Sequence, residues 1–333
     1  MKYIKTDFKV PYYNMAFENY VMNNDKFDDD YFFFYIHVPS IIVGKHQNTI
    51  EEINSEYVKK NNIIVARRNT GGGAVYHDEG NLNFSFITTK KDDIKEIDFE
   101  KYTTPVIKAL KKLGIDAVLS GRNDILVDGK KISGNAQCMN KKKVLHHGTI
   151  MFDVNVEALV NALNVSDIKI TSKAIKSVRS RVLNIKDMIN RDMDIYEFKD
   201  FILNEIYNNE DIDEYILSKE DIENIEKLVK EKYGTWDFNY GYSPKFTIKN
   251  KKKIEGVGII DIMLDIKNGL INDINISGDY FSVKETKELE DNLKGIRYKK
   301  EDVFKLLSNI NISDYIINIK NDDFIKILFN EKD

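Results

Sequence analysis

The stretch that decides the fold lies between residues 67 and 86 and combines two arginines, three glycines and an alternating apolar segment. It reads Arg67-Arg68-Asn69-Thr70-Gly71-Gly72-Gly73-Ala74-Val75-Tyr76-His77-Asp78-Glu79-Gly80-Asn81-Leu82-Asn83-Phe84-Ser85-Phe86. Consecutive glycines cost backbone entropy and are useful where the main chain must come close to a ligand. Neighbouring arginines supply forked donors for a carboxylate or a phosphate. The stretch therefore predicts an anion-binding loop for a nucleotide or an acyl phosphate, in preference to a plain hairpin turn with surface arginines.

Length and composition are typical of an intracellular enzyme with two domains. The chain has 333 residues, of which 42% are hydrophobic and 31% charged, and its formal net charge is −4. No apolar run reaches the roughly 18 residues of a membrane span, and the first residues lack the apolar core of a signal peptide. The single cysteine excludes an intrachain disulfide and favours a reducing compartment. We therefore expect a cytoplasmic protein that binds neither membranes nor nucleic acids.

Periodicity and turn residues predict helices and strands on both sides of the glycines. We expect helices over residues 12–23, 51–61, 195–207 and 218–233, and strands over 31–38, 63–66 and 81–88. Thr104-Pro105 is typical of an N-cap followed by proline at the first helical position, and Gly114 should end that helix. From residue 246 onward the pattern changes to strands near 256–266 and 270–276, followed by helices near 284–293 and 301–307.

A tight hairpin is predicted around Asp128-Gly129, because this dipeptide stands between two strand-like runs. With a two-residue loop, Leu126 pairs with Lys131 and Asp124 with Ser133. Side chains alternate faces along a strand, so Asp124 and Lys131 then share one face. Three apolar residues should enter the core from the other face: Ile125, Val127 and Ile132. A lysine held beside a carboxylate is well placed to act on a phosphate, although spacing alone favours a solvated Lys130-Lys131 pair.

Other candidate residues give weaker signals. His146 and His147 are adjacent, so on a strand they point to opposite faces and cannot chelate one metal together; either could hydrogen-bond beside a pocket or be purely structural. The Lys141-Lys142-Lys143 run suggests a solvated turn. We interpret Cys138 as non-catalytic.

The glycine stretch resembles the signature of the lipoate-protein ligases, which reads roughly Arg-Arg-x-Ser-Gly-Gly-Gly-Ala-Val-aromatic-His-Asp-x-Gly-Asn, with Thr70 in place of the usual serine. Further blocks follow in the family order. They are Gly121-Arg122-Asn123-Asp124-Ile125, Lys131-Ile132-Ser133-Gly134-Asn135-Ala136, His146-His147-Gly148-Thr149 and Ser177-Val178-Arg179-Ser180-Arg181-Val182. The resemblance covers the whole chain, including a C-terminal segment that many relatives lack.

The resemblance implies a fold of the mixed α/β (α+β) class. The catalytic domain would be the mixed sheet flanked by helices that lipoate ligases share with biotin-protein ligases and class II aminoacyl-tRNA synthetases. We expect it over residues 1–244, followed by a small α/β accessory domain over 246–333, with the segment from Trp236 to Phe246 as the junction.

The resemblance also implies a reaction and its residues. Lipoate would be activated by ATP and Mg²⁺ to lipoyl-AMP, and the lipoyl group passed to a lysine of a carrier. Lys131 matches the family's essential lysine and is the expected catalytic residue, and Asp124 the expected metal contact. The residues expected to bind ATP and the adenylate are Arg68, Gly71, Gly72, Gly73, Ala74, Val75, Tyr76, Asn123, Asp124, Lys131, Gly148, Thr149, Ser177, Val178 and Arg179. We expect an apolar tunnel for the alkyl chain, lined by Val43, Val75 and Phe84, and a closing loop over residues 171–181.

The expected carriers are apo lipoyl domains of 2-oxoacid dehydrogenase acyltransferases and the glycine cleavage H protein. Two other functions remain open. An octanoyltransferase would use a cysteine thioester in place of ATP, but Cys138 lies only seven residues after Lys131, outside that family's context. A catalytically silent carrier-binding protein is the other alternative. A biotin ligase is disfavoured because its Gly-Arg-Gly-Arg-rich motif is absent.

Overall fold

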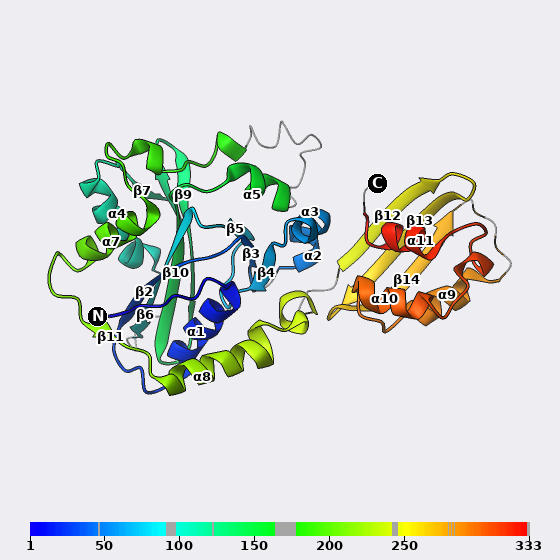
Figure 1. Ribbon diagram of the computed structural model, residues 1–333, viewed down its shortest axis with the longest axis horizontal. Helices are drawn as coiled ribbons and strands as arrows, with labels where there is room; N and C mark the ends of the chain where they lie inside the picture. The colour runs from blue at the N-terminus through cyan, green and yellow to red at the C-terminus, as the bar shows by residue number, and fades with distance from the viewer. Residues whose placement is uncertain are drawn as a thin grey trace. The chain divides into compact units, whose positions relative to one another are not determined.

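The computed structural model describes residues 1–45, 47–90, 98–121, 123–163, 178–241, 246–278, 280, 282 and 284–331. It divides into two compact units, Met1–Thr235 and Trp236–Asp333. The first unit contains a large and a small sheet, the second unit one further sheet, and each unit has its own helices (Figure 1). No helix in the described part of the chain combines the length and apolarity needed to cross a membrane.

The first unit is built on a large mixed sheet whose described strands run in the order β11-β1-β2-β6-β10-β9-β8-β7. These strands are β1 (Lys2–Ile4), β2 (Tyr31–Ile36), β6 (Asn81–Thr89), β7 (Val118–Ser120), β8 (Asp124–Val127), β9 (Lys130–Met139), β10 (Lys143–Met151) and β11 (Glu214–Tyr215). A second, small sheet has the order β4-β3-β5, with β3 (Ser40–Val43), β4 (Ile64–Arg67) and β5 (Val75–His77). The glycines lie between β4 and β5, so the small sheet fixes both ends of the glycine loop, residues 68–74.

Helices cover both faces of the large sheet. Those of the first unit are α1 (Pro11–Asn23), α2 (Thr49–Glu52), α3 (Ser55–Lys60), α4 (Phe99–Lys112), α5 (Val156–Ala162), α7 (Ile195–Ile206) and α8 (Lys219–Leu228), which continues as a π-helical turn, Val229–Tyr233. Helices α4 and α7 pack on one face and bury the main apolar core, whereas α1 and the small sheet lie on the other face (Figure 1). One face of the sheet therefore supplies the core, and the other is left for a site.

The strands β6 and β10 show how this division arises from the sequence. In β6, Leu82, Phe84 and Phe86 point into the core, while Asn83 and Ser85 point to the opposite face. In β10, His146 stacks on Tyr102 of α4 at a ring-centroid distance of 4.9 Å, and His147 points the other way. The expectation that the two histidines lie on opposite faces is confirmed.

The hairpin at Asp128-Gly129 has the predicted two-residue turn, with positive φ at both residues (49° and 73°). Leu126 pairs with Lys131 as predicted, but Asp124 pairs with Gly134 rather than Ser133, because a β-bulge shifts the register. The shared face survives this correction. Ile125, Val127 and Ile132 are buried in the main core, also as predicted.

Three further local predictions need correction. Helix α4 begins at Phe99 rather than Pro105, because Asp98 caps it by accepting from the Lys101 amide at 3.0 Å; Pro105 costs only one interior hydrogen bond. The helix expected over 51–61 is two helices, separated where the buried Ile53 bridges to Leu163. Lys143 is buried rather than solvated, and its Nζ donates to the Val21 carbonyl at 2.6 Å.

The second unit is a three-stranded antiparallel sheet with helices packed against it. Its elements are a π-helical turn (Asp237–Gly241), β12 (Phe246–Ile254), β13 (Gly258–Lys267), β14 (Leu270–Gly278), α9 (Thr286–Leu293), α10 (Lys300–Leu307) and α11 (Asn321–Leu328). The turn between β13 and β14 has positive φ at Asn268 and Gly269. Strand β12 and helix α11 were not predicted individually.

We predict that Ile132→Ala lowers the free energy of unfolding by about 2–5 kcal/mol, because Ile132 is fully buried where the bulge turns it into the core. Chemical denaturation measured by circular dichroism would test this. Lys130→Ala, two residues earlier on the same strand, is the control and should change the unfolding free energy by less than about 0.5 kcal/mol. Equal losses in the two variants would contradict the burial of Ile132 in the core.

Candidate active site

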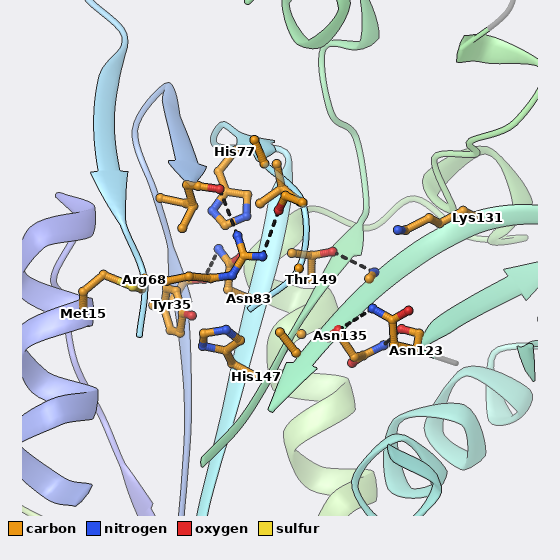
Figure 2. A pocket seen from close by; sticks show the side chains of 18 residues that line it. Met15, Tyr35, Arg68, His77, Asn83, Asn123, Lys131, Asn135, His147 and Thr149 are labelled. Carbon is orange, nitrogen blue, oxygen red and sulfur yellow. Dashed lines mark hydrogen bonds between the residues drawn. The ribbon is translucent and has the colours of Figure 1, made fainter. Parts of the chain in front are cut away.

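A cavity of about 140 Å³ lies on the α1 side of the large sheet, between that sheet, the small sheet and the glycine loop (Figure 2). Its floor follows a row of residues across the strands: Tyr35 on β2 is opposite Asn83 on β6, which is opposite Thr149 on β10. The Thr149 hydroxyl in turn accepts from the Gly134 amide on β9 at 3.2 Å, and Gly134 pairs with Asp124 on β8. The site therefore extends across most of the sheet.

Most of the residues predicted from the sequence line this cavity. They are Arg68, Gly72, Gly73, Ala74, Val75, Asn123, Lys131, Gly148 and Thr149. Five others do not line it: Gly71, Tyr76, Asp124, Val178 and Arg179. Ser177 and most of the expected closing loop lie outside the described residues. The expected tunnel is only partly right, because Val75 lines the cavity, whereas Val43 does not and Phe84 belongs to the core on the far face of the sheet.

Sequence reasoning missed several lining residues. They are Met15, Tyr35, Ile42, His77, Asn83, Gly134, Asn135 and Ala136, together with His147, whose role was left open. The alternation of Asn83 and Ser85 with Phe84 and Phe86 was a usable signal, since it marks a strand with one polar face. No comparable signal marks Met15, which is one of several apolar residues of a mixed helix, or Tyr35, which ends a run of aromatic residues.

The two arginines of the motif hold the backbone of the site in place. Arg67 is buried and its guanidinium donates to the Gly44, Lys45 and Gln47 carbonyls and to Thr49. Arg68 donates to the carbonyls of Gly71, at 2.7 Å, and Gly73, at 2.8 Å, and to Ile42 of β3 at 3.0 Å. Arg68 therefore shapes the glycine loop from within while it also lines the cavity.

A buried carboxylate balances the charge of Arg68 through two intermediate side chains. Glu18 on α1 accepts from Ser85 at 2.6 Å and from His147 Nδ1 at 3.0 Å. His147 Nε2 meets the Thr70 hydroxyl at 2.8 Å, and Thr70 also accepts from Arg68 Nε at 3.0 Å. Burial lowers the pKa of Arg68 to about 10, and the charge on Glu18 is among the influences that oppose this shift. His147 thus links the loop to the helix beneath it.

Lys131 stands at the other end of the cavity (Figure 2). Its Nζ lies 2.8 Å from Asp124 Oδ1, and both side chains are about one-third exposed (38% and 34%). This confirms that the lysine and the carboxylate share one face of the hairpin. The backbone of Lys131 is also fixed, because its amide donates to the Arg181 carbonyl and its carbonyl accepts from the Leu183 amide. The Lys131 ammonium is thus held by a partner that a substrate could reach.

Asn123 is tied to β9 rather than left free for a ligand. Its side-chain amide donates to the Asn135 carbonyl at 2.7 Å, and its own carbonyl accepts from the Asn135 side chain and backbone. Val178, which follows the undescribed segment, is buried against Val160 of α5. The contacts of Asn123 therefore fix the part of β9 that follows Lys131.

Cys138 does not have the properties of a nucleophile. It lies on β9 but does not line the cavity, and burial raises the pKa of its thiol to about 12. A thiol with such a pKa is almost entirely protonated near neutral pH and reacts slowly. This favours the non-catalytic interpretation.

The sequence also matches two family models. Residues 10–207 match the lipoyl protein ligase A/B catalytic domain, and residues 243–328 match the bacterial lipoate protein ligase C-terminus. This chain belongs to the lipoate-protein ligase family.

Individual relatives within the family agree. The lipoate-protein ligase LplJ of Bacillus subtilis is 48% identical, over 96% of this chain and 97% of its own length. Among solved structures, a bipartite lipoate protein ligase studied with its E2 lipoyl domain from Thermoplasma acidophilum is 30% identical with a TM-score of 0.65, over 74% of this chain and 98% of its own. A lipoate-protein ligase A bound with ATP is 29% identical with a TM-score of 0.64, over 72% and 98%. The expected mixed α/β ligase fold is confirmed.

The glycine loop gives a prediction that separates folding from binding. Gly72 has φ of +92°, and a Cβ there would lie 2.9 Å from Arg68 Nη2, so Gly72→Ala should both strain the backbone and push Arg68 away. At Gly73 a Cβ would have nothing within 4 Å, so Gly73→Ala should fold normally and obstruct ligand instead. Thermal melting with and without ATP would test this. A lower melting temperature for Gly73→Ala than for Gly72→Ala without ligand would contradict it.

Proposed function

We propose that this chain activates lipoate with ATP and transfers the lipoyl group to a lysine of lipoyl carrier domains. The observation that carries the proposal is that the Lys131 ammonium and the Arg68-braced glycine loop line one cavity. Such a cavity suits a reaction that gathers negative charge at one phosphate. Membership of the ligase family and the ATP-bound relative support it.

The reaction needs two steps because a carboxylate is a poor electrophile. In the first, a lipoate carboxylate oxygen attacks the α-phosphorus of ATP, pyrophosphate leaves, and lipoyl-AMP forms. In the second, the neutral ε-amine of the carrier lysine attacks the acyl carbon, AMP leaves, and the amine proton is released to solvent. Fixed donors aimed at the charge that develops in both steps are the efficient way to accelerate them.

We assign Lys131 to the carboxylate and the α-phosphate oxygens in both steps. Its ion pair with Asp124 positions the ammonium before substrate binds. The amides of Gly73, Ala74 and Val75 are assigned to the nucleotide and the adenylate, on a loop whose carbonyls are already held by Arg68. Preorganised donors of this kind do not need to reorient during the reaction.

Mg²⁺ fits the carboxylate that Asp124 offers. No group of three or more His, Cys, Asp or Glu side chains in the described residues could hold a metal ion. Mg²⁺ commonly takes one or two carboxylates together with substrate phosphates and water. We assign Asp124 to this contact; the ion would neutralise phosphate charge when ATP is bound.

We further propose apo lipoyl domains of 2-oxoacid dehydrogenase acyltransferases and the glycine cleavage H protein as carriers; the archaeal relative studied with its E2 lipoyl domain supports the first group. A cytoplasmic location stays a prediction from the composition.

The direct test of the proposed function incubates the purified chain with lipoate, magnesium-ATP and an apo lipoyl domain. The mass of the carrier is then measured by mass spectrometry. Acyl transfer that needs Cys138 but no ATP would instead favour an octanoyltransferase. If no acyl group were transferred at all, a catalytically silent carrier-binding protein would be favoured.

Lys131→Ala should reduce ligation by about a hundredfold or more and leave the fold intact, because it removes a charge-assisted contact at a crowded anionic site. Initial rates of carrier modification would measure the loss, and melting temperature would monitor folding. Lys130→Ala is the matched control and should stay within a few-fold of the parent. Similar losses in both variants would mean that charge alone, rather than position, matters.

Removal of the second unit should separate the two half-reactions. A chain that ends at Thr235 keeps every described residue of the cavity, since all belong to the first unit. We expect it to form lipoyl-AMP, measured by pyrophosphate release, but to transfer the lipoyl group more slowly than the full chain. Supplying both constructs with pre-formed lipoyl-AMP isolates the second step. Equal transfer rates would remove the second unit from the mechanism.

A further inference from the structure

His77 contributes a buried polar atom to the cavity that no described residue satisfies. The side chain is 4% exposed and lines the cavity wall from β5. Its Nδ1 lies 3.0 Å from Nδ1 of His37, but its Nε2 has no hydrogen-bond partner among the described residues. A buried donor or acceptor without a partner is costly, which makes such an atom a candidate contact for a ligand.

The hydrogen bonds behind His77 determine which form its Nε2 takes. Asn14 faces the Phe8 carbonyl at 2.7 Å, and a carbonyl only accepts, so the atom facing it is the amide nitrogen. The same nitrogen lies 3.0 Å from His37 Nε2, which must therefore accept. His37 then carries its proton on Nδ1 and donates to Nδ1 of His77. The proton of His77 consequently resides on Nε2, which is a donor.

Both histidines are neutral, as this relay requires. Burial lowers the pKa of His37 to about 3. The pKa of His77 is well below its usual range, because of burial first and the neighbouring His37, Arg68 and His147 next. Nε2 of His77 thus presents one fixed N–H to the cavity rather than a positive charge.

The position of His77 indicates which part of a ligand this N–H meets. Its ring stacks on His37 at a centroid distance of 5.2 Å, and His37 in turn lies 4.9 Å from the Tyr35 ring. Tyr35 is on β2 and Lys131 on β9, three strands away in the sheet order. Figure 2 shows Lys131 at one end of the site and Tyr35, His77 and Met15 toward the other. With the carboxyl group at Lys131, the tail of an acid points toward His77.

On the basis of the proposed function, we infer that the His77 Nε2–H donates to a sulfur of the lipoate dithiolane ring and so selects lipoate over acids with a purely hydrocarbon tail. Sulfur is a weak acceptor, but a hydrocarbon tail would leave the N–H buried and unpaired. Discrimination in a site of this kind comes mainly from that penalty against the wrong ligand. The effect expected is roughly tenfold in affinity.

Three acids test this inference on the unmodified chain by isothermal titration calorimetry. They are lipoate, 5-cyclopentylpentanoate, which keeps the five-membered ring and lacks sulfur, and octanoate, which lacks the ring. We expect lipoate to bind roughly tenfold more tightly than the cyclopentyl acid. Equal dissociation constants for these two acids would overturn it, and this comparison needs no variant.

Two variants at His77 then identify the donor. In His77→Asn the side-chain oxygen takes the place of Nδ1 and can accept from His37, but no donor remains at the position of Nε2. In His77→Gln the amide nitrogen lies near the position of Nε2. The dissociation constant of the cyclopentyl acid divided by that of lipoate should fall toward one in His77→Asn. In His77→Gln this ratio should be partly retained.

The remaining outcomes are distinguishable. If His77→Asn weakens both ring acids equally, His77 is structural and the inference fails. A water molecule held on Nε2 in place of sulfur would leave the ratio unchanged in the variant and would also overturn it. Failure of the proposed function has another signature: the parent chain would attach none of the acids to a lipoyl domain with magnesium-ATP, and both proposals would then fall.

Discussion

The guanidinium of Arg68, buried beneath the glycine loop, is the interaction on which the site depends. Its donors hold the carbonyls of Gly71 and Gly73, so the amides of the same loop are left in a fixed arrangement. Burying a charge is expensive unless it is paired and hydrogen-bonded. The carboxylate of Glu18, connected through His147 and Thr70, supplies the opposite charge within the same buried network. Two residues of the loop, Arg68 and Thr70, and one residue each from α1 and β10 thus maintain one loop conformation.

The hairpin that carries Lys131 shows how much of the site the sequence alone could predict. Lys131 and Asp124 were placed on one face because a two-residue turn and strand alternation are local rules that act over few residues. The same rules failed to give the bulge between Ile125 and Leu126, which depends on how Ile132 fits the core. Local rules therefore predicted the face of Lys131 but not its complete register.

The polar partners of the site are separated much further along the chain. Thr70 and His147 are 77 residues apart, and His147 and Glu18 are 129 apart. Tyr233 bonds Asn69 of the motif across 164 residues. Such pairs add nothing to hydrophobic periodicity, so they become visible only when the fold brings them together. Glu18 in particular resembles an ordinary surface residue of helix α1 in the sequence, yet it is fully buried.

The core and the cavity share the same strands, and this sharing gives the site its rigidity. Phe84 and His146 point from β6 and β10 into the core, while Asn83 and His147 point from the same strands toward the cavity. Gly148 lies where the two sides leave least room, since a Cβ there would collide with both Asn135 and Phe84. Because interiors are close-packed, a shift of β10 toward the cavity would also disturb aromatic packing behind it. The cavity floor therefore keeps its shape through contacts that never touch a ligand.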